Sequence, residues 1–229
     1  MEKKKMKCSI KMLLFGVAFA VCSIPVQAIS IHTSDFIADS SRTNLNGFEG
    51  MAQFYDGSIP YIEGGISVQQ INGDGLDIGT ISPPEGNQSW YPSGGDFGYT
   101  EIRLSDGSNF GNVGFFAATG SYGAATNTIL FDLLDDGVSV LSGSIAGLQF
   151  LHDGFNYFGF GEGGFDTVRL SDNAGSQTSV YSGLLQALSI DAIEVSEVSA
   201  VPIPAAVWLF GSGILGLLGL QRKRKLKAV

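Results

Sequence analysis

The chain has 229 residues and a formal net charge of −9, and 44% of its residues are hydrophobic. Basic residues are concentrated at the two ends, so residues 29–200 contain three arginines, no lysine and 21 acidic residues, a formal charge of −18. This composition excludes a nucleic-acid-binding protein, because neutralising phosphates requires a basic surface. It also argues against recognition of acidic substrates or anionic lipid by the middle region.

The first 28 residues have the three parts of a secretory signal peptide. Five lysines accompany an apolar stretch, residues 12–22, that is too short to span a bilayer comfortably. Pro25 follows, and residues 26–28 place small side chains at the cleavage positions. We expect export through the Sec machinery, a signal helix, and cleavage by signal peptidase after Ala28.

Residues 29–200 show the pattern of one all-β domain, with short apolar or alternating runs between clusters of Gly, Asp, Ser and Asn. We predict an antiparallel β-sandwich, since no long amphipathic helix is evident, although residues 181–189 also fit a short helix. The expected strands, in chain order, are 52–55, 61–70, 99–104, 112–118, 129–134, 138–145, 157–161, 165–171 and 184–195.

Two of these strands resemble each other. Residues 99–106 and 166–172 each place an arginine, Arg103 or Arg169, on a polar strand face that ends in an Asp-containing turn. Two copies are too few for a solenoid. We interpret them as similar strands in two packed sheets, with each arginine paired to a local carboxylate rather than to a ligand.

Calcium is the cofactor that the composition favours, because hard cations take oxygen ligands and carboxylates greatly outnumber arginines here. A Gly-rich segment at 72–77 offers Asn72, Asp74 and Asp77 as ligands, although it lacks the first and last acidic ligands of an EF-hand. The alternative is a solvated turn that binds no metal.

Aromatic side chains are the second candidate set. Trp90 and Tyr91 lie in a Pro-, Gly- and Ser-rich stretch, 82–95, where exposed rings would stack on sugar rings. The alternative is that both rings pack in the core.

The sequence offers little for catalysis. The only histidines of the middle region are His32, near the mature N-terminus where we expect fraying, and His152. The two cysteines, Cys8 and Cys22, both precede residue 29. No nucleophile elbow, zinc motif or phosphate loop is present, so we predict that the protein is not an enzyme. Paired carboxylates for glycoside hydrolysis remain the alternative.

The C-terminal 29 residues contain three features in order. A proline motif, residues 201–204, precedes the charge-free apolar run 205–220, and a basic tail follows at 222–227. Residues 201–220 as a helix would be about 30 Å long, the thickness of the hydrocarbon core. Basic residues after such a span stay cytoplasmic, so a domain preceded by a cleaved signal lies outside the membrane. We expect a transmembrane helix here.

This arrangement resembles a PEP-CTERM sorting signal of the VPLPA variant. Its proline motif is formed by Val201, Pro202, Ile203 and Pro204, with Ile203 in the usual leucine position, and its stop-transfer tail by Arg222, Lys223, Arg224 and Lys225. The resemblance implies cleavage near the motif by an exosortase-type membrane protease in a Gram-negative, exopolysaccharide-producing bacterium. The domain would then be attached or released at the cell surface or in the biofilm matrix.

The middle region also resembles, more diffusely, the jelly-roll sandwiches of carbohydrate-binding and matrix domains. The markers are Gly47-Phe48-Glu49, Ser89-Trp90, Phe158-Gly159-Phe160 and a final strand at 188–195. In similar domains an early Glu and a late Asp share a structural Ca²⁺, which makes Glu49 and Asp191 the matching candidates.

Together these features predict an exported surface or matrix protein with a structural or adhesive, glycan-binding role. Its partners would be the exosortase-type protease, the export machinery and exopolysaccharide. The rival hypothesis is an extracellular polysaccharide-modifying enzyme that uses carboxylates. Its candidate carboxylates are Glu49, Glu63, Glu101 and Glu162.

Overall fold

The computed structural model describes residues 28–52, 55–71, 83–92, 98–120, 128–172 and 188–197. Within these ranges the secondary structure consists of strands and one 3-10 turn, Leu151–Asp153, and no helix is long and apolar enough to cross a membrane. The expected helices at 12–22 and 205–220 lie outside the described residues. The strands are β1 Ser30–His32, β2 Arg42–Asn46, β3 Tyr61–Glu63, β4 Ile66–Ile71, β5 Tyr99–Leu104, β6 Asn112–Thr119, β7 Thr128–Asp135, β8 Val138–Ala146, β9 Gln149–Phe150, β10 Asn156–Gly161, β11 Thr167–Asp172 and β12 Leu188–Ser196.

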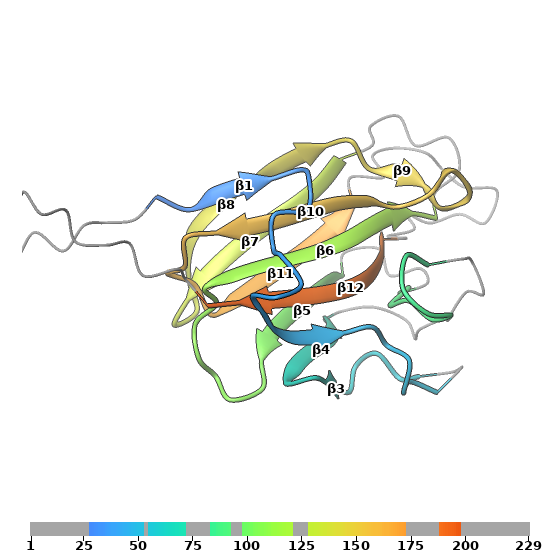
Figure 1. Cartoon of the computed structure of the whole chain (residues 1–229), viewed down its shortest axis with the longest axis horizontal. Helices are drawn as coiled ribbons and strands as arrows, with labels where there is room; N and C mark the ends of the chain where they lie inside the picture. Colours follow the sequence, from blue (N-terminus) through green and yellow to red (C-terminus); the bar gives the residue numbers. More distant parts are fainter. Residues whose placement is uncertain are drawn as a thin grey trace, which may run out of the picture. The chain divides into compact units, whose positions relative to one another are not determined.

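These strands form two sheets that pack face to face (Figure 1). Sheet 1 has the order β1-β10-β6-β12-β2, with β9 beside β6, and sheet 2 has the order β3-β4-β5-β11-β7-β8. All neighbours pair antiparallel except β6 and β9. Apolar side chains from both inner faces build one core, in which the ring centroids of Phe131 and Phe160 lie 5.0 Å apart across the sheets. The predicted all-β antiparallel sandwich is confirmed for the described residues.

From β5 to β11, every observed strand except β9, which was not predicted, lies within two residues of a predicted one. The stretch 61–70 differs from its prediction, because it is a hairpin rather than one strand. Gly64 and Gly65 both have positive φ and form a two-residue turn that pairs Glu63 with Ile66. At Gly64 a Cβ atom would lie 1.9 Å from the carbonyl oxygen of Leu45, so glycine is required there.

The expected strand at 52–55 is not observed, because Ala52 and Tyr55 lie in no strand and residues 53–54 are outside the described ranges. The expected strand at 184–195 begins at Leu188, and residues before 188 lie outside the described ranges, as does most of the alternative helix at 181–189.

The N-terminal part of the domain is more ordered than its sequence suggested. The prediction that His32 frays is wrong, since β1 pairs with β10 and sets His32 opposite Gly159. The two similar strands also lie elsewhere than expected. They are β5 and β11, direct antiparallel neighbours within sheet 2 rather than members of two sheets. Their arginines do pair with a local carboxylate, as predicted, because both Arg103 and Arg169 contact Glu101.

Candidate functional site

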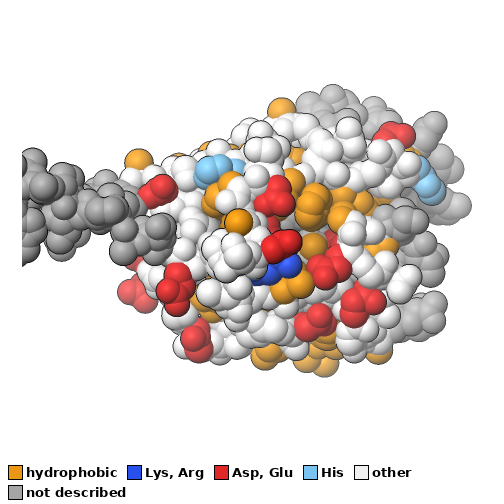
Figure 2. Space-filling view, viewed as in Figure 1, with side chains coloured by type: hydrophobic (Ala, Val, Ile, Leu, Met, Phe, Trp, Pro, Cys, Tyr) orange, Lys and Arg blue, Asp and Glu red, His pale blue; other side chains and the backbone are white. Residues whose placement is uncertain are grey.

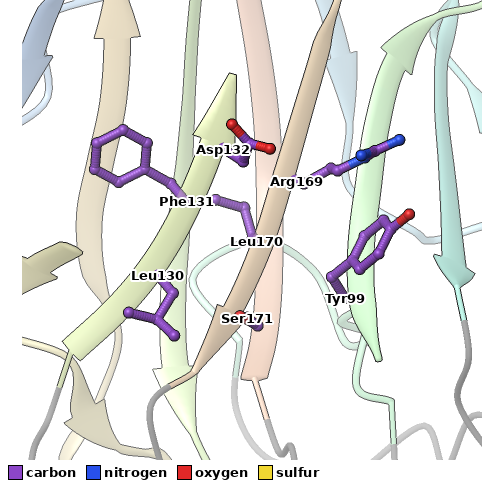
Figure 3. Close-up of a pocket in the computed structure, with 7 residues that line it drawn as sticks. All are labelled: Tyr99, Leu130, Phe131, Asp132, Arg169, Leu170 and Ser171. Atoms are coloured by element: carbon purple, nitrogen blue, oxygen red, sulfur yellow. The ribbon is translucent and has the colours of Figure 1, made fainter. Parts of the chain in front are cut away.

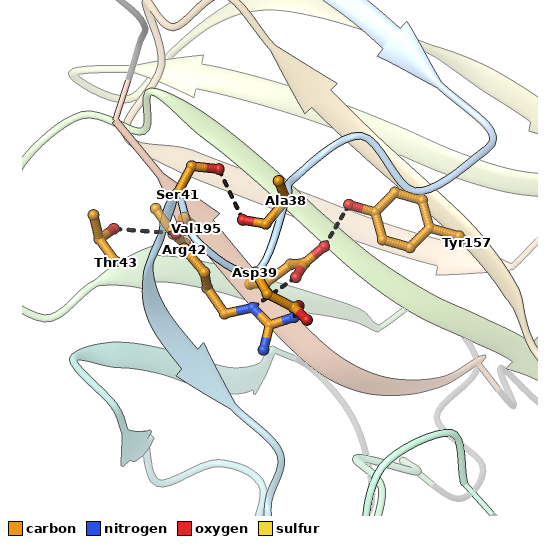
Figure 4. Close-up of polar contacts among 8 residues, drawn as sticks. Ala38, Asp39, Ser41, Arg42, Thr43, Tyr157 and Val195 are labelled. Atoms are coloured by element: carbon orange, nitrogen blue, oxygen red, sulfur yellow. Dashed lines mark hydrogen bonds and ion pairs between the residues drawn. The ribbon is translucent and has the colours of Figure 1, made fainter.

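The outer face of sheet 1 is covered by its own chain. Residues 33–41, here called the N-terminal strap, run from β1 at one edge to β2 at the other edge and cross this face (Figure 4). Phe36 of the strap packs edge-on against Tyr157, with 6.3 Å between ring centroids. Ile37 is 3% exposed. At Gly159 a Cβ atom would lie 2.5 Å from the Phe36 ring, so the missing side chain lets the strap approach the sheet.

A buried polar network anchors this strap. Glu194 of β12 accepts hydrogen bonds from Tyr157 Oη at 2.7 Å and from Arg42 Nε at 2.9 Å, and Arg42 also pairs with Asp39 of the strap (Figure 4). Burial raises the pKa of Glu194, while its bonds to Tyr157 and Arg42 act in the opposite direction. Burial, followed by the Glu194 carboxylate, raises the pKa of Tyr157. Both Glu194 oxygens therefore have protein partners, and neither is available to a ligand. We interpret the network as the attachment of the strap to sheet 1.

Asp191, three residues earlier on the same strand, has an unused oxygen. The register of β12 against β6 shifts between Asp191 and Glu194, where Ala192 has a φ of +47°, so a bulge separates the two carboxylates. Asp191 Oδ2 accepts from the backbone amide of Glu85 at 2.8 Å, but Oδ1 has no hydrogen-bond partner although the residue is 0% exposed. Burial, with smaller contributions from Glu85 and Glu49, raises the pKa of Asp191 to about 7.

Glu49 reaches the same turn. Its Oε1 accepts from the backbone amides of Asn87 and Gln88 at 2.7 and 3.0 Å. Gly86 has a φ of +59°, and a Cβ there would lie 2.1 Å from Glu49 Oε1. The turn 85–88 therefore receives both carboxylates that the jelly-roll resemblance singled out. We call Glu49, Glu85 and Asp191, with this turn, the acidic cradle.

The donor set of the cradle suits a hard cation. An ionised carboxylate oxygen that is buried without a partner is unfavourable unless a cation or a proton neutralises it. Among the described residues, no three His, Cys, Asp or Glu side chains lie close enough together to hold a metal ion by themselves. Side chains alone would thus not complete a coordination sphere, and Ca²⁺ commonly adds backbone carbonyls and water. Asn72, Asp74 and Asp77 of the other predicted site lie outside the described residues.

The aromatic pair predicted for sugar contact is placed differently by the structure. Trp90 is 0% exposed, forms a bridge with Ile190 of β12, and packs between Phe48 and Tyr55. Its ring is therefore part of the core and has no face for a glycan, which corrects that prediction for Trp90. Tyr91 is half-buried beside Gly120, where a Cβ would lie 2.0 Å from its hydroxyl.

The outer face of sheet 2 carries a depression of about 220 Å³ (Figure 3). Its polar side chains come from the outward-facing positions of three adjacent strands, with Tyr99 on β5, Arg169 on β11 and Asp132 on β7. The Arg169 guanidinium lies over the Tyr99 ring, 4.9 Å from its centroid. The full lining is Tyr99, Leu130, Phe131, Asp132, Arg169, Leu170 and Ser171.

Hydrogen bonds fix the polar groups of this depression. Glu101 accepts from Arg169 Nε at 2.9 Å and pairs through its other oxygen with Arg103 Nε, also at 2.9 Å. Asp132 accepts from the Ser139 hydroxyl of β8. This depression could not be predicted from the sequence, which indicated only a structural ion pair for Arg169 and not which strands lie beside β11. The signal it had was the repeated Arg-containing strand.

The carboxylates of the rival enzyme hypothesis have the following partners. Glu63 contacts Tyr61 and the backbone amides of Gly47 and Gly50, whereas Glu101 holds two arginines. Glu162 lies in a turn with a φ of +76°. Ala28 is exposed, two residues before β1. The proline motif at 201–204 and the basic tail at 222–227 lie outside the described residues.

Comparison with known proteins found no matching family model and no matching curated protein. Among solved structures, the CBM22-1 xylan-binding domain of Xyn10C from Paenibacillus barcinonensis is 12% identical with a TM-score of 0.39, covering 70% of this chain and 96% of that one. A family 29 carbohydrate-binding module is 11% identical with a TM-score of 0.32, covering 77% and 99%. The enzymatically active domain of tailspike protein 4 from bacteriophage CBA120 is 15% identical with a TM-score of 0.31, covering 58% and 19%.

Proposed function

We propose that this chain is an exported surface or matrix protein whose sandwich binds neutral glycan on the outer face of sheet 2. The observation that carries the proposal is the depression between Tyr99, Arg169 and Asp132. It combines an aromatic ring, a guanidinium whose Nε is already committed to Glu101, and a carboxylate that accepts from Ser139. Such a mixture suits a sugar ring, which presents both CH surface and hydroxyl groups.

The charge of the domain determines whether a neutral or an anionic glycan can bind. Arg103 and Arg169 balance Glu101 and Asp132 around the depression, while the region 29–200 carries a formal charge of −18. Acidic side chains are also spread over the outer face of sheet 1, which Figure 2 shows and which lies on the other side of the sandwich from the depression. A polyanionic glycan would be repelled by the net negative charge of the whole domain, so we assign the site to neutral sugars.

Isothermal titration of the full-length chain with neutral oligosaccharides identified on a glycan array tests this assignment. We expect Arg169→Gln to weaken binding about tenfold, because a charge-assisted hydrogen bond to the sugar is lost. Arg103→Gln is the matched control, since Arg103 also pairs with Glu101 but does not line the depression. Equal affinities for wild type and both variants would exclude this face as the binding site.

The acidic cradle is proposed as a structural Ca²⁺ site. Glu49 and Asp191 would contribute carboxylate oxygens, and backbone carbonyls and water would supply the remaining ligands. The charge of the ion would neutralise the buried Asp191 oxygen that lacks a partner. We expect Ca²⁺ to raise the melting temperature of the full-length chain and EGTA to reverse the rise. Asp191→Asn should abolish the effect, whereas Glu194→Gln should keep it, because both Glu194 oxygens already have protein partners.

Export and sorting are supported by the two chain ends. The signal sequence ending at Ala28, the proline motif Val201, Pro202, Ile203 and Pro204, and the tail Arg222, Lys223, Arg224 and Lys225 predict delivery across the membrane and release by an exosortase-type protease. Mass spectrometry of the surface fraction should find chains that begin at Ile29 and end near Val201. Surface chains that retain the basic tail would contradict processing.

A further inference from the structure

One edge of the sandwich differs from the others in length and charge. β8 is the outermost strand of sheet 2, and within the described residues it pairs with β7 alone. Seven of its nine residues are exposed, including Val138 at 67% and Val140 at 45%. No charged residue and no proline occurs from Val138 to Leu151.

The other three edge strands carry the protections that natural sheets use against pairing with a further strand. β1 and β3 have three residues each, and β3 ends in Glu63. β2 contains Arg42, and its edge is occupied by the turn between β3 and β4, where Asn44 donates a hydrogen bond to the Gly64 carbonyl. β8 has one such feature, a bulge at Val140 where its register against β7 shifts, and Leu141 to Ala146 are regularly paired beyond it.

We propose that β8 is a self-association edge, at which β8 of a second copy of this chain adds antiparallel to extend sheet 2. A two-fold axis at Gly143 would set Leu141 against Ile145 of the other copy on the core side and Ser142 against Ser144 on the outer side. Leu141 packs against the core and Ile145 is 7% exposed, whereas Ser142 and Ser144 are exposed. Apolar groups would thus meet apolar groups, and hydroxyls would meet hydroxyls.

Charge favours a second copy at this edge over other contacts between copies. Two domains with a formal charge of −18 repel wherever carboxylates face each other, and this edge presents none between Val138 and Leu151. Charges further away than about 8 Å are largely screened at physiological ionic strength. A basic partner would instead be attracted to the acidic surfaces.

The pairing of two β8 strands would also affect glycan binding, and this further step rests on the proposed function. Antiparallel strands within one sheet are related by an axis perpendicular to the sheet, so both outer faces would point the same way. Two depressions would then lie on one side of the dimer, and a polysaccharide with repeated units would engage both of them.

Sedimentation velocity of the full-length chain in detergent, over a range of concentrations and without glycan, tests the pairing. We expect dimers for the wild type and about tenfold weaker association for Ser144→Lys, which places like charges on both copies beside the axis. Ser144 is the better position because its neighbour on β7 is Leu130, whereas Ser142 lies opposite Asp132. Ile62→Lys is the matched control, because it adds the same charge at a 57%-exposed position on β3, the opposite edge of sheet 2. All variants retain the same apolar termini, so association through those segments would not distinguish them.

Hydrogen exchange gives a second measurement that needs no variant. Amides between Leu141 and Ala146 should exchange more slowly as the protein concentration rises. A wild type that stays monomeric, association that Ser144→Lys leaves unchanged, or exchange independent of concentration would each overturn the proposal. A dimer that binds polysaccharide no better than a short oligosaccharide would leave the pairing intact and count against the glycan site.

Discussion

The outer faces of the two sheets use the same three residue types differently. On sheet 1, Glu194 joins Tyr157 and Arg42 beneath the N-terminal strap, and the Glu194 side chain is 4% exposed. On sheet 2, Glu101 joins Arg169, which lies over Tyr99 and lines the depression with it. The comparison teaches that the same three residue types attach a covering segment on one sheet and line a depression on the other.

A second contrast lies within β12. Glu194 and Asp191 are both buried, but Glu194 bonds through both oxygens and Asp191 through one. Glu194 contacts Tyr157 and Arg42 beneath the strap, whereas Asp191 contacts the turn 85–88. Burial alone therefore does not distinguish the two carboxylates, and the oxygen without a partner is what makes Asp191 the candidate for a cation.

The largest expected effect comes from breaking the clamp. Glu194→Ala should lower the free energy of unfolding by about 3 kcal/mol, because Arg42 is left without its buried partner. Glu101→Ala should lower it by about 1 kcal/mol, because its arginine partners are 31% and 50% exposed and solvent can replace the contacts that they lose. Denaturant unfolding measures both variants, and equal losses would contradict the distinction between the faces.

The contact between the N-terminal strap and sheet 1 is tested by adding a side chain at Gly159. Gly159→Ala should lower the free energy of unfolding by about 2 kcal/mol, because the added methyl group would meet Phe36 and the Val113 carbonyl. Combined with Phe36→Ala, the loss should be smaller than the sum of the two single losses, since one clash is relieved. Additive losses would show that the strap does not rest on Gly159.

The pH dependence separates the two carboxylates of β12. Without calcium, Asp191 has a pKa of about 7 in the folded chain against 3.8 in the unfolded chain, so the folded state retains a proton that the unfolded state has lost. Stability should fall as the pH rises from about 4 to 7, by at most about 1.4 kcal/mol per unit. Urea unfolding with EGTA should show this slope, and Asp191→Asn or saturating Ca²⁺ should reduce it. A slope unchanged in Asp191→Asn would assign the titration to another group.

The smallest expected effect is on the outer face of sheet 2. Arg169→Gln should change the free energy of unfolding by less than about 0.5 kcal/mol, because Glu101 keeps Arg103 as a second partner. Arg42→Gln should lower it by about 1.5 kcal/mol, because its partner Glu194 is buried. Thermal melts of the pair measure the difference. A large loss for Arg169→Gln would make this arginine structural rather than a candidate glycan contact.

Local patterns predicted most strands but not their connections. The alternation at 61–70 was interpreted as one strand because Gly64 and Gly65 leave the apolar period intact on both sides of the turn. β1 and β2 were missed because each is short and depends on its partners, β10 and β12, for its conformation. The sequence left Trp90 open between a glycan contact in a Pro-, Gly- and Ser-rich loop and packing in the core, and its bridge to Ile190 places it in the core.

The sequence by itself determined the all-β class, the separation of charge between the ends and the middle region, and the local turns, because these follow from residue periodicity and composition over a few positions. The tertiary structure alone decided which acids stand together. Glu49 meets the turn that also contacts Asp191, and Arg169 meets Glu101, across 38 to 106 positions of sequence. Sheet order sets such distances, and sheet order depends on the packing of the whole core.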